Sequence, residues 1–312
     1  MSSTQPGTAP VEPPFASVTI IGLGLIGSSV ARAVRHHLPG VRVIGHDADG
    51  DVRARARAIG FCDVADVLAD AVADAQLVII AVPVGAIGAV AAQIAPHLPA
   101  DAVVSDVGSS KASVMAAMRA ALPNHAIIPA HPVAGTEHSG PESGFATLFR
   151  GRWCIITPPD GADSAAAARV VALWQALGAD VEVMDARHPD LVLAVTSHLP
   201  HLIAYTIVGT ASDLEEVTQG EVIKYSAGGF RDFTRIAASD PVMWRDVFLS
   251  NKDAVLDMLQ RFSEDLSHLQ RAIRWGDGDA LFELFSRTRT IRRSIVEQGQ
   301  DDAAPDFGRK HD

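Results

Sequence analysis

The sequence contains little cysteine: its 312 residues include only Cys62 and Cys154. This excludes a disulfide framework, and the lack of any C-x-x-C pair excludes the commonest zinc motifs. Positive charge is also scarce, since the formal net charge is -11. That acidic balance argues against nucleic acid or an anionic membrane as the main partner. Any anionic substrate must therefore be bound by locally placed cations.

Targeting signals and long apolar runs are missing as well. Residues 1–15 are rich in Ser, Pro and Thr and lack a cationic start, so we expect a disordered tail and no signal peptide. The polar residues 300–312 are expected to form a second disordered tail. No apolar segment is expected to be long enough to cross a membrane. We therefore expect a soluble, cytoplasmic protein.

A glycine motif follows the first apolar run of the chain. The β-branched residues Val18–Ile21 predict a buried strand, which ends at Gly22-x-Gly24-x-x-Gly27 and leads directly into a helical pattern. Gly22 permits a tight turn, Gly24 lets a pyrophosphate approach the backbone, and Gly27 lets the helix pack closely on the strand. The phosphates would then lie at the positive end of the helix. This context predicts a dinucleotide site, the alternative being an ordinary glycine turn.

Asp47 indicates which dinucleotide is bound. It ends a second predicted strand, Val41–His46, at the distance from Gly27 where a ribose-binding acid is expected. Its carboxylate can accept hydrogen bonds from ribose hydroxyls but would repel a 2′-phosphate. Ala48 and Asp49 offer no cation to compensate, and Arg53 falls on the following helix. The sequence therefore predicts NAD in preference to NADP.

Short apolar strands alternate with helices as far as residue 187, a pattern that predicts a doubly wound, mostly parallel α/β sheet of the Rossmann type. From Asp190 no convincing strand appears again. We expect an NAD-binding domain over residues 16–187 and an all-helical substrate and dimerisation domain over residues 188–299. The strands are predicted at 77–82, 102–106, 126–130, 153–157 and 181–184, in addition to the first two.

The helical half carries more apolar surface than it can enclose. Leu191–Val208 is apolar on nearly every face, which predicts a buried helix. Later apolar residues recur at steps of three and four, a spacing that predicts helices packed along a seam. A small all-helical half with this much apolar surface is suited to dimerisation, so we expect a homodimer. The seam residues are Val255, Leu259, Phe262, Leu266, Leu269, Ile273, Leu281, Phe285, Thr288, Ile291 and Ile295.

Two polar clusters follow predicted strands of the first domain. Ser109 lies just after the strand that ends at Asp106, where open α/β sheets bind ligands. It could reach the nicotinamide or the substrate, or it could serve as a helix N-cap. His131 leaves the next strand into a loop rich in Gly and Pro. Its ordinary pKa suits a general base, although a structural histidine is the alternative.

A third cluster lies in the helical half. His198 and His201 are three residues apart in Ser197-His-Leu-Pro-His201, and Pro200 withdraws a backbone donor and can bend the helix there. No H-E-x-x-H motif accompanies them, so we expect no metal. Arg235 follows a glycine loop; it suits carboxylate recognition, the alternative being a surface ion pair.

Together these motifs resemble the prephenate/arogenate dehydrogenase family of tyrosine biosynthesis, whose members include broad-specificity cyclohexadienyl dehydrogenases. The likeness runs from about Ser17 to Gln298, in order. It implies NAD(P)-dependent oxidative decarboxylation of prephenate to 4-hydroxyphenylpyruvate, or of arogenate to tyrosine, and a helical dimerisation domain. The motifs are Gly22–Gly27, Asp106–Lys111, His131–Glu137, Ser197–His201 and Gly229–Ile236.

The resemblance also implies roles for single residues. His131 resembles the catalytic acceptor of the ring hydroxyl proton, with Ser109 as its hydrogen-bonding neighbour, and Arg235 resembles the ligand of the ring carboxylate. His201, Ser197 and Thr136 are expected near the substrate, and Glu137 and Asp232 in an ionic network with Arg235. The expected cofactor contacts are Gly22, Gly24, Leu25, Ile26, Gly27, Asp47, Val82, Pro83, Asp106 and Ser109.

Two other functions have to be weighed. A dehydrogenase of the β-hydroxyacid or 6-phosphogluconate type would use a lysine of the helical domain as acid or base. Lys224, Lys252 and Lys310 are the lysines of this half, and none lies in a matching motif. A non-catalytic NAD-sensing protein would keep the glycine motif and Asp47 but would not need His131 and Arg235 together.

Overall fold

The computed structural model describes residues 13–136, 138–185, 187–213 and 228–297. They fall into two compact units. The first extends to His198 and also includes Ala238–Lys252, and the second comprises Leu199–Ala237 and the residues from Asp253 onward. Most of both expected tails lies outside the described residues. Phe15, assigned to the first tail, is instead buried, because the guanidinium of Arg169 stacks on its ring 4.1 Å from the centroid.

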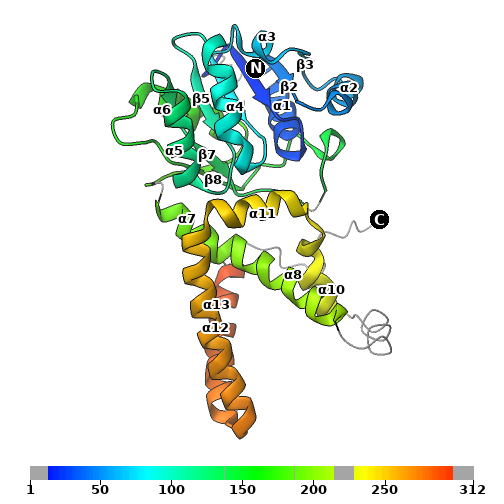
Figure 1. Cartoon of the computed structure of the whole chain (residues 1–312), viewed down its shortest axis with the longest axis vertical. Coiled ribbons are helices and arrows are strands. Elements are labelled where there is room, and N and C mark those ends of the chain that lie inside the picture. The colour runs from blue at the N-terminus through cyan, green and yellow to red at the C-terminus, as the bar shows by residue number, and fades with distance from the viewer. Residues whose placement is uncertain (1–12, 137, 186, 214–227, 298–312) are drawn as a thin grey trace, which may run out of the picture. The chain divides into compact units, whose positions relative to one another are not determined.

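A six-stranded parallel sheet forms the centre of the first unit, which confirms the predicted doubly wound fold (Figure 1). Its order, β3-β2-β1-β4-β5-β6, reverses direction between β1 and β4, the position where such sheets bind dinucleotides. The central strands β1, β4 and β5 are buried along their whole length, and β4 is fully apolar, because both faces of the sheet are covered. They are β1 (Ser17–Ile21), β2 (Arg42–His46), β3 (Asp63–Val64), β4 (Leu77–Ile80), β5 (Val103–Asp106) and β6 (Ala126–Ile127).

Helices cover the two faces of this sheet. Alternate residues of β4 enter different buried clusters: Leu77 and Ile79 join one, and Val78 and Ile80 join the other. Residues 63–64 pair with β2 as a short strand at the edge of the sheet. The surrounding helices are α1 (Leu25–His37), α2 (Gly50–Ile59), α3 (Leu68–Val72), η1 (Val84–Ala86), α4 (Ile87–Ile94), η2 (Ala95–His97) and α5 (Lys111–Ala121).

The predicted strand 126–130 is divided between two sheets. β6 pairs with β5, whereas β7 (Ala130–Pro132) pairs antiparallel with β8 in a separate three-stranded sheet. Pro129 has no N–H to continue the first ladder, and its carbonyl accepts from the Thr157 N–H at 2.9 Å. The division places His131 at the centre of β7. The remaining elements of this region are β8 (Trp153–Ile156), β9 (Asp180–Val183), η3 (Pro141–Ser143) and α6 (Ser164–Ala176).

The first compact unit extends beyond the boundary expected at residues 187 and 188. It includes α7 (Arg187–Leu193), the π-helical turn η4 (Ala194–His198) and α11 (Pro241–Ser250). The Asp190 carboxylate of α7 accepts hydrogen bonds from the backbone N–H groups of α5, at 2.6 Å from Lys111 and 3.0 Å from Ala112. These contacts explain why α7 groups with the sheet domain.

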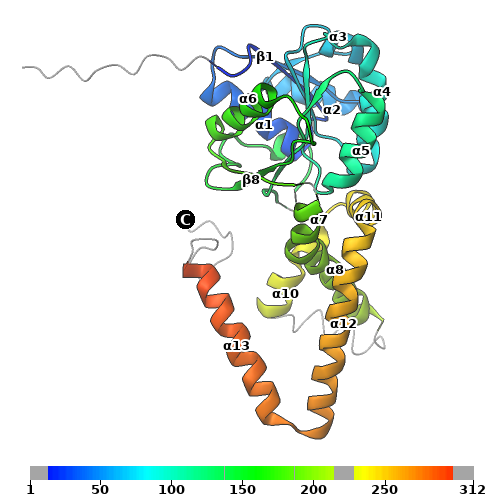
Figure 2. The ribbon, with the colours of Figure 1, turned by 90° about the vertical axis from the view of Figure 1, so that its left-hand side faces the viewer.

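The second unit is entirely helical over its described residues, as predicted. α8 and α10 pack on each other, and α12 turns into α13 at Gly276, whose positive φ of 67° suits glycine. Figure 2 shows α12 and α13 diverging from this turn. The helices are α8 (Leu199–Ser212), α10 (Gly228–Thr234), η5 (Arg235–Ala238), α12 (Lys252–Trp275) and α13 (Gly278–Glu297).

Two expectations about the helix that begins at His188 were wrong. His188–Ser212 is long and apolar enough to cross a membrane by length and composition, although a core helix of a soluble protein passes the same test. Only 22% of its apolar window is buried within this chain, so the predicted burial of Leu191–Val208 is incomplete. Leu191 and Val195, for example, remain 44% and 47% exposed.

The seam residues of α12 and α13 are largely uncovered within one chain. Val255 is buried, but Leu266, Ile273 and Phe285 are exposed, as is Phe282 at 74%. No described residue of α13 is buried. Apolar stripes at helical spacing that stay exposed mark a surface for another protein chain.

Candidate active site

The glycine turn brings the start of α1 close to the carboxyl edge of the sheet. Gly22 ends β1 with φ of 96°, and a Cβ there would overlap the Ala81 carbonyl. A Cβ on Gly27 would overlap the Gly22 carbonyl, whereas one on Gly24 would meet no atom within 4 Å. Leu25 and Ile26 are half-buried beside this open space. No side chain caps the first turn of α1. The turn therefore leaves backbone N–H groups open to a pyrophosphate.

Asp47 lies beside the glycine turn, at the end of β2. One carboxylate oxygen accepts the Leu23 N–H at 2.8 Å, and the other accepts the Asp49 N–H at 3.0 Å. A carboxylate offers further acceptor positions, so ribose hydroxyls can still be bound. The residues of the turn and Asp47 thus fit the adenosine half of a dinucleotide.

The expectation that no cation lies near Asp47 was wrong. Arg53 reaches back from α2, and its Nη1 donates to the carbonyls of Asp47 at 2.6 Å and Ala48 at 3.1 Å. The same guanidinium pairs with Asp66 at 3.4 Å. The cation is thus used to hold the turn after β2. The predicted preference for NAD over NADP then depends on the Asp47 carboxylate itself.

Val82 and Pro83 follow β4 on the other side of the switch point. Val82 is half-buried and Pro83 is exposed, and the Ala81 N–H donates to the Ile21 carbonyl at 2.7 Å. The next turn, η1, packs against α11. A Cβ on Gly85 would lie 2.9 Å from an Asp246 carboxylate oxygen. No local pattern could have indicated this contact, because α11 lies about 160 residues further along the chain.

Asp106 ends β5, but its side chain has no exposed surface. One carboxylate oxygen accepts the Lys111 ammonium at 2.6 Å and the Gly108 N–H at 2.8 Å. Burial raises the pKa of Asp106, and the Lys111 charge opposes that shift. The expected contribution of Asp106 to cofactor binding is therefore indirect, through the loop that it organises.

Ser109 lies in that loop and is half-buried. The N-cap of α5 is Ser110, and the Asp190 carboxylate accepts the first N–H groups of the helix. The alternative role of Ser109 as the helix cap is thus taken by other residues. Its predicted place beside the nicotinamide or substrate stays a prediction.

His131 lies partly exposed on β7, with its imidazole Nδ1 3.1 Å from the Val107 carbonyl oxygen. A carbonyl only accepts, so Nδ1 carries the proton and Nε2 keeps a lone pair. Burial, followed by the Lys111 ammonium, lowers the pKa of His131 from 6.5 to about 3. The imidazole is therefore neutral at physiological pH, as a proton acceptor must be.

The loop after His131 returns to α1, a course that the sequence did not reveal. Gly144 packs so closely that a Cβ would overlap Ser28 Oγ, and the Phe145 N–H donates to Ser29 Oγ at 3.2 Å. Thr136 is exposed in this loop, and its hydroxyl accepts the His138 N–H at 3.3 Å. Glu137 lies outside the described residues. Thr136 therefore lies in the loop that runs from β7 to the contact with α1.

The π-helical turn η4 carries Ser197 and His198. π-Turns inside helices often mark functional sites, and the missing N–H of Pro200 accounts for the irregularity here. His198 is fully buried, and its Nδ1 lies 3.1 Å from the Asn251 amide nitrogen. The same amide donates to the Asp190 carbonyl at 2.8 Å. Sequence reasoning missed Asn251, since a single Asn has no motif.

The remaining predicted substrate residues belong to the second unit. Arg235 begins η5 directly after α10, which packs on α8, the helix that carries His201. Asp232 forms an ion pair with Arg231 at 3.2 Å. The predicted ionic network of Asp232, Glu137 and Arg235 stays a prediction, as does the approach of Arg235 and His201 to the substrate.

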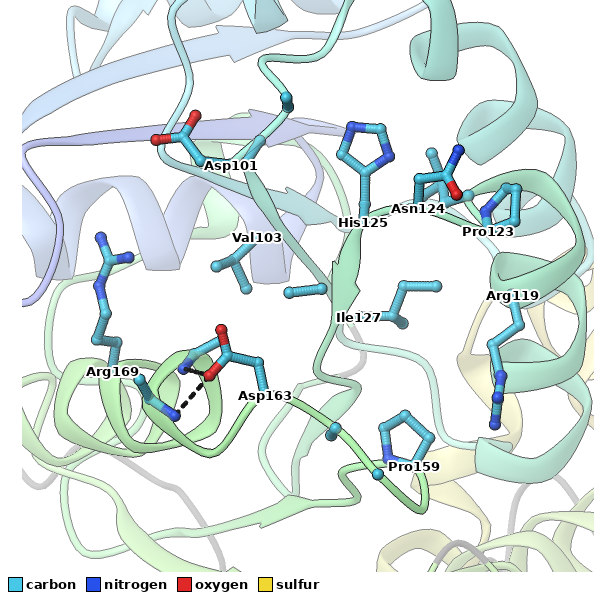
Figure 3. Close-up of a pocket in the computed structure, with 18 of the residues that line it drawn as sticks. Asp101, Val103, Arg119, Pro123, Asn124, His125, Ile127, Pro159, Asp163 and Arg169 are labelled. Carbon is cyan, nitrogen blue, oxygen red and sulfur yellow. Dashed lines mark hydrogen bonds between the residues drawn. The ribbon is translucent and has the colours of Figure 1, made fainter.

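A hollow of about 770 Å³ lies away from all of these residues (Figure 3). It is lined by the amino ends of β5 and β6, for example by Val103 and Ala126, and by Asp163 and Arg169. Asp163 caps α6 at 2.8 Å from the Ala165 N–H, and Arg169 donates to the Pro14 carbonyl. Sheets of this type bind ligands at the opposite, carboxyl edge. We therefore assign the site to the carboxyl edge and not to this hollow.

Comparisons with known proteins match both halves of the chain. The nucleotide-binding domain of prephenate dehydrogenase matches residues 30–183, and its dimerization domain matches residues 185–287. Cyclohexadienyl dehydrogenase of Zymomonas mobilis is 46% identical over 90% of this chain and 96% of its own. Prephenate dehydrogenase of Bacillus subtilis is 32% identical over 93% of this chain and 79% of its own.

A solved structure agrees with these matches. Prephenate dehydrogenase from A. aeolicus, in complex with hydroxyphenyl propionate and NAD+, is 32% identical and superposes with a TM-score of 0.83. The superposition covers 89% of this chain and 98% of that one. Because relatives match both halves in order and nearly from end to end, the chain belongs to the prephenate dehydrogenase family.

Proposed function

We propose that this protein catalyses the NAD-dependent oxidative decarboxylation of both prephenate and arogenate. Membership of the family supports the reaction, and the 46% identical cyclohexadienyl dehydrogenase supports the breadth of substrate, since both substrates are cyclohexadienyl compounds. The comparisons favour this reaction over that of a β-hydroxyacid or 6-phosphogluconate dehydrogenase. The observation that carries the proposal is the neutral imidazole of His131, held with its Nε2 lone pair available in a dinucleotide-binding fold.

NAD held by the glycine turn and Asp47 would supply the acceptor for the hydride of ring C4 of the substrate. His131 accepts the proton of the C4 hydroxyl at Nε2, because Nδ1 is already donating to Val107. Breaking the bond from C1 to its carboxylate releases CO₂, and the bonding electrons complete the aromatic ring. The proton on His131 can then return to the phenol oxygen. Ser109 would orient the hydroxyl toward His131.

Cofactor binding depends on the residues at the switch point. Gly22, Gly24 and Gly27 leave the backbone open at the N-terminus of α1, and Asp47 would accept hydrogen bonds from the ribose. A family neighbour has NAD+ bound. NAD is therefore the cofactor that these residues fit.

Substrate specificity is expected to depend on the two ends of the substrate. Arg235 would bind the ring carboxylate, which both substrates share, and His201 and Ser197 would contact the side chain. The side chain of arogenate carries an ammonium where prephenate has a keto group. Glu137 offers a negative charge that an ammonium would favour.

Two variants test this proposal. Arg235→Ala should weaken binding of both substrates by about 2–5 kcal/mol if the ion pair is desolvated. Glu137→Gln should lower kcat/KM for arogenate more than for prephenate. An equal loss on both substrates would show that Glu137 has no part in specificity, and wild-type activity on one substrate alone would refute the proposed breadth.

We propose further that the enzyme is a homodimer that works in the cytoplasm. The exposed seam of α12 and α13 supports a second copy as the partner, because the matched family domain is a dimerization domain. The long apolar helix from His188 contains the buried polar residues Asp190 and His198, which hydrogen-bond to Lys111 N–H and Asn251. Such contacts suit a helix in a soluble domain better than one in lipid.

A further inference from the structure

Lys111 is a fully buried charged side chain beside the proposed base. Its Nζ donates to an Asp106 carboxylate oxygen at 2.6 Å and to the Ala130 carbonyl at 2.7 Å. Neither Lys111 nor Asp106 has any exposed side-chain surface. Burying an ion pair costs desolvation energy that its attraction often fails to recover, and an apolar pair would often be at least as stable. Stability alone therefore does not explain why a buried ion pair occurs at this place.

The reason lies in the residues that follow the two partners of Lys111, Asp106 and Ala130, in the sequence. Asp106 precedes Val107, whose carbonyl accepts from the imidazole of His131, and Ala130 precedes His131 itself. The Lys111 ammonium thus joins Asp106 to Ala130. These two residues directly precede Val107 and His131, which form the hydrogen bond that orients the imidazole. Two connections run side by side between the end of β5 and the start of β7, one through Lys111 and one through His131. A shift of β7 away from β5 would break both.

We propose that Lys111 and Asp106 form a clamp that positions His131, with Nδ1 on the Val107 carbonyl and Nε2 left as the acceptor. This rests on the proposed function, in which His131 is the base. Lys111 touches neither the reacting atoms nor the imidazole, so it is a positioning residue. The Asp190 carboxylate accepts the backbone N–H of Lys111 and so fixes this residue at the first turn of α5. This anchor keeps the Lys111 ammonium in its buried position.

The charges around His131 agree with this role. Burial lowers the pKa of His131 most; the Lys111 ammonium from α5 and His198 from η4 lower it further, while the hydrogen bond to the Val107 carbonyl raises it. Asp106 on β5 neutralises Lys111, and Cys154 on the paired strand β8 is a neutral thiol, since burial raises its pKa. Burial, with a smaller contribution from Lys111, therefore keeps the base neutral before the substrate arrives.

The test uses the full-length protein with the pair replaced by neutral side chains of similar size, Lys111→Met with Asp106→Asn. Lys111→Met alone would leave a buried carboxylate unpaired and destabilise the domain, so the double variant is the informative one. We expect kcat at neutral pH to fall by about 10–100-fold through misplacement of the base. Because a displaced imidazole would lose part of the burial that lowers its pKa, we also expect an acid limb in kcat/KM to appear between pH 7 and pH 5, where the wild type has none.

A second measurement does not depend on activity. NMR of isotope-labelled histidine, with the His131 signal identified from a His131→Asn sample, reports its tautomer and titration directly. We expect the wild type to stay in the neutral Nδ1–H form from pH 8 to pH 5, and the double variant to titrate within that range. If the wild type oxidised neither prephenate nor arogenate, the proposed function would be refuted. The NMR measurement would still test whether Lys111 and Asp106 position His131, because it does not depend on activity.

Ser110→Ala is the matched control, since Ser110 is buried next to Lys111 but bonds only the Ser250 hydroxyl among the described side-chain contacts, at 2.9 Å. In this variant kcat/KM should show no acid limb between pH 7 and pH 5, and His131 should titrate as it does in the wild type. A folded double variant whose His131 titrates as in the wild type would overturn the clamp. So would a Ser110→Ala variant that reproduces the titration of the double variant.

Discussion

The imidazole Nδ1 of His131 and the carbonyl oxygen of Val107 lie 3.1 Å apart, and this single contact decides which nitrogen can act as a base. The carbonyl belongs to the loop after β5, whereas His131 belongs to β7 in the smaller sheet. The two sheets therefore meet at the proposed proton acceptor. Changes at this contact should alter both the pH dependence of activity and the stability of the fold.

The acid limb of kcat/KM should lie well below that of an ordinary histidine. Burial and the Lys111 ammonium lower the pKa of His131 to about 3 in the folded protein, against 6.5 when unperturbed. The free enzyme therefore keeps its base neutral, and kcat/KM should stay level from pH 7 to pH 5. An unshifted histidine would lose about 30-fold over the same range. A limb centred near pH 6.5 would contradict the lowered pKa of His131.

Acid stability depends on the same shift with a defined sign. Below pH 6.5 the unfolded chain binds a proton at His131 that the folded chain does not, so acidification favours unfolding until the pH falls through the folded pKa of about 3. His131→Asn removes this contribution. The variant should lose less free energy of unfolding than the wild type between pH 7 and pH 5 in urea titrations.

Replacing Asp47 with Asn should weaken the preference for NAD. The amide oxygen can still accept the Leu23 N–H, but the negative charge toward the ribose is lost. We expect kcat/KM for NAD to fall by about 5–30-fold, from the difference between charged and neutral hydrogen bonds. The ratio of NADP to NAD activity should rise. Asp49→Asn is the control, because Asp49 caps α2 through the Asp51 N–H and should leave that ratio unchanged.

Asn251 should matter for stability more than its position in the sequence suggests. Its buried amide donates to both the Asp190 carbonyl and His198 Nδ1. Asn251→Leu leaves these two acceptors unsatisfied, so the free energy of unfolding should fall by about 2–4 kcal/mol. Asn124→Leu, at an exposed position, should change it by less than about 0.5 kcal/mol. Equal effects in urea denaturation would refute the role given to Asn251.

The oligomeric state should depend on the seam of the second unit. Phe282 and Phe285 are exposed on α13 in a single chain, and a charge in a buried interface is costly. We expect the wild type to be a dimer by light scattering and Phe285→Asp to shift it toward monomer. Ser263→Asp, on an exposed position of α12 outside the predicted seam, is the control. A monomeric wild type would contradict the proposed dimer.

The sequence predicted the parts of this molecule that depend on local pattern. The run Val18–Ile21, the glycines after it and Asp47 specify a strand, a turn and a ribose acid within one short segment, and the fold prediction was confirmed. The strand that leads into His131 was predicted as one piece, because its composition does not reveal that Pro129 transfers the chain to a second sheet.

Contacts between distant segments were beyond local pattern. Asp190 caps α5 from about 80 residues away, and Asn251 joins Asp190 to His198 from still further along the chain. Arg53 was placed correctly on a helix, but its length let it reach back to the carbonyl of Asp47. Lys111 belonged to a recognised motif, yet only the fold shows that its ammonium is buried against the Ala130 carbonyl.

The most direct test of the proposed reaction mixes the full-length protein with NAD and prephenate and follows NADH absorbance together with CO₂ release. We expect one CO₂ and one 4-hydroxyphenylpyruvate for each NADH. His131→Asn should lower kcat by about 10²–10⁴-fold while KM for prephenate changes little. NADH without CO₂, no NADH from either prephenate or arogenate, or a His131→Asn variant with near-normal turnover would contradict the reaction and the role of its base.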